Sequence, residues 1–202
     1  MEIARERGMK IEAILSTHVQ ADHRSGEREL AARTGAPIYY HRSAQLQFPF
    51  TPLDDGAEVS LGNVVIRALH TPGHTPESTS FVVRDLTRSN EPWFVLTGDT
   101  LFVGDIGRPD LGGPAAASDL FTSLHDKLLA LPDYVEVYPA HISGSPCGRA
   151  MSGKPSSTIG FERRNNGALV ETNRELFVEA LRGFSAAKPP GWLEIFATNR
   201  RG

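Results

Sequence analysis

The chain has 202 residues, of which 40% are hydrophobic and 22% are charged, with a formal net charge of −3 at pH 7. This composition is that of an ordinary globular domain, and its charge gives no reason to expect nucleic acid or an anionic membrane as a partner. No apolar run approaches the roughly 20 residues of a membrane span. The single cysteine, Cys147, excludes an internal disulfide and favours a cytoplasmic location.

The first part of the chain predicts short helices and strands in alternation. Hydrophobic spacing and turn residues indicate the end of a helix, a buried strand, a helix stopped by Gly35 and a second strand, at Glu2 to Gly8, Lys10 to Leu15, Arg24 to Thr34 and Pro37 to Tyr40. A long polar loop with Pro49, Pro52 and Gly56 is expected to follow. A chain that opens on a frayed helix suggests that an earlier pair of strands precedes this sequence.

The remainder predicts a run of strands followed by helices. The strands are expected at Glu58 to Leu69 (two, around the Gly62-Asn63 turn), Ser78 to Arg84, Trp93 to Leu96 and Val135 to Tyr138. Helices are expected from a Ser118 cap to Leu129, and at about 159 to 166 and 171 to 182. This pattern predicts a single α/β domain over 1–202, with about 185–202 as a tail or linker.

Four short segments place metal-binding side chains directly after strand-like runs. Thr17 to His23 contains two histidines, an aspartate and a glutamine, and it is followed by Pro72-Gly73-His74, Gly98-Asp99-Thr100 and Pro139-Ala140-His141. Histidine and aspartate are the ligands of catalytic first-row metals. The convergence of four such segments predicts one metal site in a cleft between strand-end loops, and scattered surface histidines are the alternative.

These segments resemble the metallo-β-lactamase superfamily: His-x-Gln-x-Asp-His at 18–23, Thr71 to Thr75, Thr97 to Leu101 and Tyr138 to His141. The resemblance implies an αββα sandwich with the metal where the two sheets meet, and its first two strands would precede Met1. Leu101 to Leu111 and Ser156 to Glu162 are similar to the persulfide dioxygenases and their rhodanese-fused relatives. A rhodanese domain would then follow near the end of this chain.

The resemblance implies a single iron held by His18, His74 and Asp99. Two histidines and one carboxylate leave positions open for substrate and dioxygen, which suits non-haem Fe(2+); Zn(2+) is the alternative. The family motif usually has a second histidine where this chain has Gln20, and a carboxamide is a weak ligand for a transition metal. Gln20 therefore disfavours a two-metal hydrolytic site more than a one-iron site.

Three further side chains of the motifs have two interpretations. Asp22, His23 and His141 would bind a second metal in the hydrolases, whereas beside one iron they would orient ligands and move protons. Packing without a catalytic task is the alternative. Outside the motifs, we interpret His70 as structural and His41 and His125 as surface histidines.

Substrate contacts are predicted for two residues. Arg108 could bind an anionic group of the substrate, or it could form a structural pair with Asp110. Cys147 could accept sulfane sulfur, or it could be an incidental thiol. Arg163 and Arg164 are read as solvated surface charges.

Three functions stay open at the level of sequence. The first is a sulfur dioxygenase that oxidises a thiol persulfide, such as glutathione persulfide, to sulfite and thiol. The second is a metal-dependent thioester hydrolase similar to hydroxyacylglutathione hydrolase. The third is a non-catalytic module that binds a partner. A rhodanese partner domain is expected for the first, and a homodimer stays open for all three.

Overall fold

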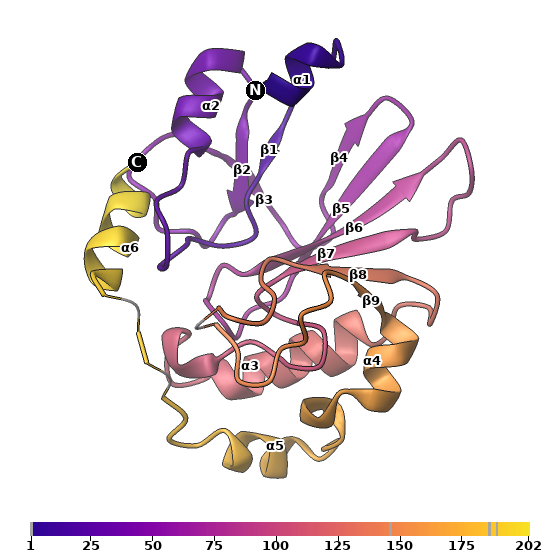
Figure 1. Cartoon of the computed structure of the whole chain (residues 1–202), viewed down its shortest axis with the longest axis vertical. Helices are drawn as coiled ribbons and strands as arrows, with labels where there is room; N and C mark the ends of the chain where they lie inside the picture. Colours follow the sequence, from indigo (N-terminus) through magenta and orange to yellow (C-terminus); the bar gives the residue numbers. More distant parts are fainter. Residues whose placement is uncertain (1, 146, 186, 189) are drawn as a thin grey trace.

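A computed structural model describes residues 2–145, 147–185, 187–188 and 190–202, and it shows two sheets side by side with helices on the outside (Figure 1). One sheet has three strands in the order β1-β2-β3 and the other has six in the order β4-β5-β6-β7-β8-β9. The strands are β1 (Ile14–Leu15), β2 (Ile38–His41), β3 (Thr51–Leu53), β4 (Glu58–Leu61), β5 (Val64–His70), β6 (Thr79–Asp85), β7 (Phe94–Gly98), β8 (Glu136–Pro139) and β9 (Ser157–Thr158). The predicted α/β layers are confirmed.

The helical segments lie before, between and after these strands. They are α1 (Glu2–Glu6), α2 (Glu27–Thr34), the 3₁₀ turn η1 (Pro109–Leu111), α3 (Ala116–Thr122), the π-helical turn η2 (Ser123–Leu128), α4 (Ile159–Asn165), the 3₁₀ turn η3 (Gly167–Leu169), α5 (Arg174–Ala180) and α6 (Trp192–Arg201). In the described part of the chain, no helix is long and apolar enough to cross a bilayer.

The six-stranded sheet forms the main core with α3 and η2. Its strands are antiparallel except for the parallel pair β7–β8. Because these two strands run in the same direction, the loops that follow them leave the sheet at the same end. Val95 and Val137 of these strands are fully buried and belong to the same cluster as Leu120, Leu124 and Leu128 on the helix. Removing this apolar surface from water is the main force that presses the helix onto the sheet.

The three-stranded sheet is parallel and includes a strand that the sequence did not predict. β3 contains Pro52, which pairs with Tyr40 of β2 in a segment expected to be a loop. Proline cannot donate a ladder hydrogen bond, but β3 is an edge strand, where that donor is not needed. The expected strand Lys10 to Leu15 is reduced to its last two residues, Ile14–Leu15.

The first helix after the glycine-rich loop begins earlier than predicted. Ser118 was expected to cap it, but α3 begins at Ala116 and no side chain caps it. Ser118 therefore lies inside the helix, where its carbonyl accepts a hydrogen bond from the Arg174 guanidinium of α5. The first amides of a helix have no hydrogen-bond partner within the helix, and a cap usually supplies one. In this helix the amide of Ala116 donates to the backbone carbonyl of Gly113 instead.

The segment 185–202, expected to be a tail or linker, contains the helix α6. In Figure 1 this helix lies at the left, on the side of the molecule that holds α2 and the three-stranded sheet, whereas α5 lies at the bottom. Phe196 packs against the core of that sheet, and Asn199 is only 5% exposed. Prolines near the start of the segment suggested a linker, but these contacts join residues more than 140 positions apart.

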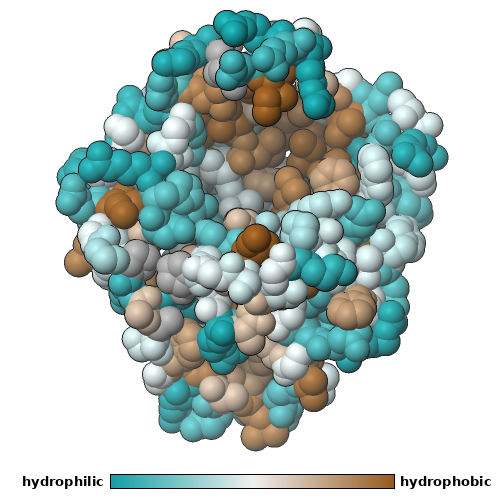
Figure 2. Space-filling view, viewed as in Figure 1, coloured by the Kyte–Doolittle hydropathy of each residue, from teal (hydrophilic) through white to brown (hydrophobic). Residues whose placement is uncertain are grey.

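One end of the sandwich is less well covered than the rest. Val59, Ile66 and Leu15 pack against the small cluster of Leu53, Ala68 and Phe81 but are only partly buried. Figure 2 shows hydrophobic side chains in a hollow at the end of the molecule where α1, β1 and β4 lie in Figure 1. The expectation that two further strands precede the sequence stays a prediction.

Candidate metal centre

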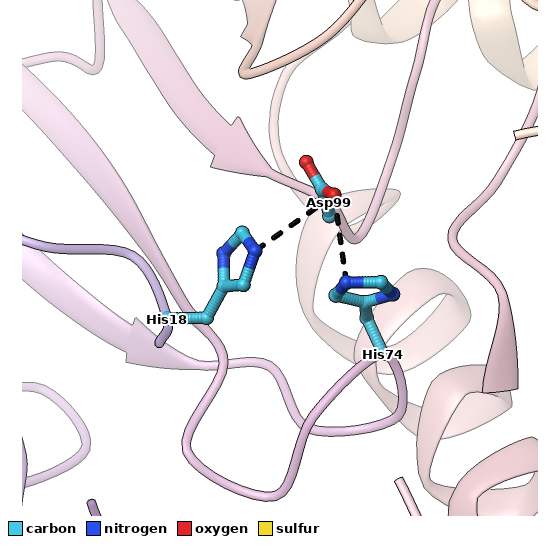
Figure 3. A group of neighbouring side chains, drawn as sticks. All are labelled: His18, His74 and Asp99. Atoms are coloured by element: carbon cyan, nitrogen blue, oxygen red, sulfur yellow. Dashed lines mark ion pairs between the residues drawn. The ribbon is translucent and has the colours of Figure 1, made fainter. Parts of the chain in front are cut away.

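His18, His74 and Asp99 converge from three separate chain segments (Figure 3). His18 follows β1, His74 lies in the turn after β5, and Asp99 follows β7. One ligand atom from each lies within 4.8 Å of the others, and the three residues are 3%, 2% and 1% exposed. The structure thus brings together the three predicted ligands in a buried place.

The distances within this group fit ligands that share an ion. Asp99 Oδ2 lies 3.8 Å from His18 Nε2 and 3.4 Å from His74 Nε2, both too long for hydrogen bonds. Two ligand atoms each about 2.1 Å from one ion lie roughly 3 to 4 Å apart, depending on the angle at the ion. Asp99 Oδ2 is also buried with no hydrogen-bond partner among the described residues, which is costly unless a cation fills the place. We conclude that the residues present fit a metal ion.

Two glycines let the ligand segments approach so closely. Gly73 has φ of +137°, and a Cβ there would lie 2.5 Å from Leu120 Cβ on α3. Gly98 has φ of +54°, and its Cβ would lie 2.8 Å from Thr17 Cβ. No other residue type combines positive φ with the absence of a side chain.

Hydrogen bonds leave the Nε2 atoms of both histidines facing Asp99. His74 Nδ1 donates to the Arg108 carbonyl at 3.1 Å, and His18 Nδ1 lies 3.0 Å from Thr17 Oγ1. A histidine whose Nδ1 carries the proton offers the Nε2 lone pair to a metal. Burial lowers the pKa of His74 to about 4, so this imidazole is neutral near pH 7.

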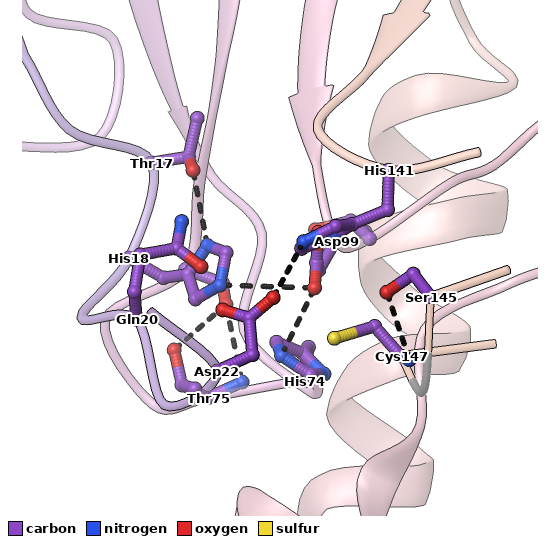
Figure 4. Close-up of polar contacts among 12 residues, drawn as sticks. Thr17, His18, Gln20, Asp22, His74, Thr75, Asp99, His141, Ser145 and Cys147 are labelled. Atoms are coloured by element: carbon purple, nitrogen blue, oxygen red, sulfur yellow. Dashed lines mark hydrogen bonds and ion pairs between the residues drawn. The ribbon is translucent and has the colours of Figure 1, made fainter. Parts of the chain in front are cut away.

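A second group of ligand-type side chains, Asp22, His141 and Cys147, adjoins the first (Figure 4). His141 bridges the two groups: its Nδ1 lies 2.7 Å from Asp99 Oδ1, and its Nε2 lies 3.0 Å from Asp22 Oδ2. Burial opposes its charge and is the largest single effect, but the hydrogen bonds and charges of Asp99 and Cys147 together outweigh burial and raise the pKa of His141 to about 11. For Asp99, burial is likewise outweighed, by His18 and His141, and its pKa is lowered.

The other two residues of the first motif do not join either group. His23 has a side chain 57% exposed, and its Nδ1 contacts Asp22 Oδ1 at 2.9 Å. Gln20 lines the same cavity as His18 and His74. His23 thus orients Asp22, and its role as a ligand of a second metal stays a prediction.

The two predicted substrate residues lie at the cavity with different surroundings. The Arg108 guanidinium is 3% exposed and makes two hydrogen bonds of 2.6 Å to Asp110, which is the structural pair that the sequence offered as an alternative. Its carbonyl orients His74. Cys147 is 9% exposed and lines the same cavity, and burial raises the pKa of its thiol. Substrate binding by either residue stays a prediction.

The remaining histidines are more buried than expected. His41 is 8% exposed and stacks on His70 with ring centroids 3.6 Å apart. His70 is structural, as predicted, because its Nε2 bonds the Pro76 carbonyl at 2.8 Å. His125 is half-buried against the Phe121 ring, so neither it nor His41 is a surface histidine. Aromatic stacking between distant segments has no signal in sequence spacing.

Sequence reasoning missed Asn199, which holds the first motif from α6. Its Nδ2 donates to the carbonyls of Gln20 and His23 at 2.9 and 2.8 Å, and its Oδ1 accepts from the Ser25 amide at 2.9 Å. These bonds fix the backbone on both sides of Asp22. No local pattern reveals a contact across more than 170 residues.

Comparisons with known proteins agree with this geometry. The family model described as metallo-beta-lactamase superfamily matches residues 1–141. The chain is 33% identical over 158 residues to the probable metallo-hydrolase YqgX of Bacillus subtilis (68% of this chain, 71% of that protein). It is 28% identical over 191 residues to the human mitochondrial persulfide dioxygenase ETHE1 (93% of this chain, 68% of that protein).

Two solved structures extend the comparison to the fold. A metallo-beta-lactamase from Staphylococcus aureus superposes with a TM-score of 0.90 at 33% identity, over all of this chain and 61% of that one. ETHE1 from Myxococcus xanthus superposes with a TM-score of 0.84 at 29% identity, over 98% of this chain and 80% of that one. The chain therefore spans less than two thirds of the S. aureus protein. The family model, the matched motifs and the shared fold together show that this chain belongs to the metallo-beta-lactamase superfamily, in a branch similar to ETHE1.

Proposed function

We propose that the chain is a one-iron sulfur dioxygenase that acts on the persulfide of a small thiol such as glutathione. The reaction is RSSH + O₂ + H₂O → RSH + SO₃²⁻ + 2 H⁺. The observation that carries the proposal is a buried group of two histidines and one carboxylate beside a glutamine in place of the usual histidine. Such a group leaves several positions of an iron ion open. The likeness to persulfide dioxygenases supports the same assignment.

Iron, when bound, supplies the redox chemistry, and the chain supplies position and protons. His18, His74 and Asp99 would hold the ion, with the tautomers of the histidines set by Thr17 and by the Arg108 carbonyl. His141 keeps Asp99 and Asp22 oriented and holds a proton next to the cavity. A proton held there can reach the thiolate that leaves the substrate.

A metal-dependent hydrolase is the second candidate, and one observation favours it. Asp22 and His141 lie beside Asp99, where a second ion would need its ligands. The named relative from B. subtilis is a probable metallo-hydrolase. Against it stands Gln20, since a neutral carboxamide replaces an imidazole at the first ion.

Oxygen uptake separates the two candidates. Protein purified without oxygen and loaded with Fe(2+) should consume dioxygen and release sulfite when glutathione persulfide is added, and it should hold about one iron per chain. The same protein loaded with Zn(2+) should do neither. Hydrolysis of S-lactoylglutathione by the zinc form, with two metals per chain and no oxygen uptake by the iron form, would establish the hydrolase instead.

The proposal extends to the setting of the enzyme. A cytoplasmic location fits the single cysteine, and a rhodanese domain that follows this one would pass sulfane sulfur to or from the thiol. Cys147, which lines the cavity, is the proposed acceptor of that sulfur in this domain. Association as a homodimer stays open in this proposal.

A further inference from the structure

The turn that leads to His74 packs along one face of the helical segment formed by α3 and η2. Gly73 lies against Leu120 of α3, because a Cβ at Gly73 would lie 2.5 Å from the Leu120 Cβ. One residue earlier, the Pro72 carbonyl accepts a hydrogen bond of 2.7 Å from the hydroxyl of Ser123, the first residue of η2. Ser123 is fully buried, so water cannot take the place of this donor.

Lys127, four residues after Ser123 in the same π-helical turn, holds the start of the segment. Its Nζ donates to the His70 carbonyl at 2.7 Å and to Asp55 Oδ2 at 2.8 Å. The other oxygen of that carboxylate, Asp55 Oδ1, accepts from the His70 amide at 2.8 Å. Lys127 and Asp55 therefore bind the carbonyl and the amide of the same residue, and their ion pair joins the two bonds.

These contacts follow the helix in order. As the chain passes from residue 70 to residue 73, its partners on the helix pass from residue 127 to residue 120. Residues three and four apart share one face of a helix, so a single face supports three of the four residues before the ligand. The carbonyl of the fourth, Thr71, accepts from the Thr100 hydroxyl at 3.3 Å. A π-helical turn such as η2 is rare, and such turns occur frequently at functional sites.

The neighbouring side chains of the same helical segment serve a different contact. The Arg174 guanidinium of α5 donates to Thr122 Oγ1 at 2.7 Å, and it lies 3.6 Å from Asp126 Oδ2. Thr122 and Asp126 thus join the helix to α5, whereas the residues that directly follow them join it to the turn.

We propose that Ser123 and Lys127 are positioning residues of the metal centre, which fix the backbone before His74 so that its Nε2 meets the ion beside Asp99. The Arg108 carbonyl binds the His74 ring at Nδ1 and sets its orientation, but that bond does not fix the backbone from which the ring projects. Neither positioning residue lines the cavity at the ligands. The inference rests on the proposed function only in requiring that His74 bind a metal ion.

Binding of Zn(2+) and Co(2+) tests this role without oxygen chemistry. In the full chain, the double substitution Ser123→Ala/Lys127→Met should weaken Zn(2+) binding about tenfold in chelator competition, and each single substitution should weaken it less. The visible absorption of the Co(2+) form should change with the double substitution, because these bands report the geometry of the ligands. Lys127→Arg keeps the charge and the donors, and it should restore both the affinity and the spectrum.

Thr122→Ala and Asp126→Asn are the matched controls, since they remove contacts of the same helix with Arg174 and leave the turn alone. Both should bind Zn(2+) like the unchanged protein, and urea unfolding of the metal-free proteins compares their stabilities with those of the variants. Unchanged affinity and spectrum in the double variant would overturn the positioning role, and so would equal losses in the controls. If the double variant does not fold, Ser123→Ala alone decides by the same criteria.

The outcome is separate from the oxygen assay. Metal affinity that depends on Ser123 and Lys127, without oxygen uptake by the iron form, leaves the positioning role standing and removes the dioxygenase. Oxygen uptake by the iron form, with metal affinity that the substitutions do not change, leaves the dioxygenase standing and removes the positioning role. Failure of the unchanged protein to bind any of these ions would overturn both.

Discussion

The two groups of ligand-type side chains at this centre differ in how their polar atoms are satisfied. In the group of His18, His74 and Asp99 the facing atoms are buried and make no hydrogen bonds to one another. In the group of Asp22, His141 and Cys147 only the first two residues are partly exposed, and His141 bonds both neighbouring carboxylates. The first arrangement suits a bound cation, whereas the second has a positive charge of its own on His141. This difference supports the one-ion proposal.

The largest effect is expected from the unsatisfied carboxylate. Asp99→Asn removes the negative ligand at the buried position, and iron affinity should fall roughly 10²- to 10³-fold, about one ligand's share of a metal site. Chelator competition under anaerobic conditions measures it. The matched variant Asp22→Asn should cost about tenfold or less, as expected of a group that does not bind the ion. Equal losses would erase the distinction between the two groups.

The bridge between the groups should have a smaller effect. His141→Gln removes the charged donor to Asp99 and Asp22, and affinity for iron should fall about tenfold because the ligand carboxylate is less well oriented. His23→Gln is the control, since that side chain is mostly exposed. If His141→Gln bound iron as tightly as the unchanged protein, the two groups would be independent.

Asn199 tests whether the second group depends on α6. Asn199→Ala removes three hydrogen bonds around Asp22 and leaves their part-buried backbone partners unpaired, which should lower the free energy of unfolding by about 2 kcal/mol. Urea unfolding measures the loss, and amide exchange at Ser25 should accelerate. Glu194→Ala, exposed on the same helix, should change stability by less than about 0.5 kcal/mol. Similar values for both would assign Asn199 no role.

The last prediction concerns metal-free protein, in which the imidazoles of His74 and His141 should not titrate near neutral pH. The pKa of His74 is lowered to about 4 and that of His141 is raised to about 11, so neither imidazole should change charge between pH 5.5 and 8.5 in nitrogen-detected NMR spectra. Because unfolded His74 binds a proton more readily, its contribution to stability falls as pH drops from about 6.5 to about 4. His141 acts oppositely: its contribution is complete below pH 6.5 and is lost as pH rises toward 11. If both rings titrated near pH 6.5, the expected difference between the pKa of His74 and that of His141 would be contradicted.

Sequence reasoning located the ion-binding group but not its support. His18, His74 and Asp99 could be found because each follows an apolar strand-like run, and two of them, His74 and Asp99, directly follow a glycine. The bridge by His141 follows from the same rule. Asn199 could not be found, because it acts through contacts with residues remote in sequence.

The elements that sequence patterns misplaced share the same cause. Pro52 argued for a loop, yet its edge position makes the missing amide harmless. The prolines before α6 argued for a linker, yet Phe196 finds an apolar cluster that only the folded sheet presents. Local propensity describes what a segment does alone, and here tertiary packing decides otherwise.

The attachment of α6 also has a consequence for the order of events during synthesis. The loop that contains Asp22 is made early, but the amide that secures it belongs to residue 199. Until that helix has left the ribosome, nascent chains hold His74 and Asp99 next to an unsecured loop. We therefore expect the metal site to reach its final form only after synthesis, and proteins cut or fused within 185–191 should emerge with this site poorly loaded.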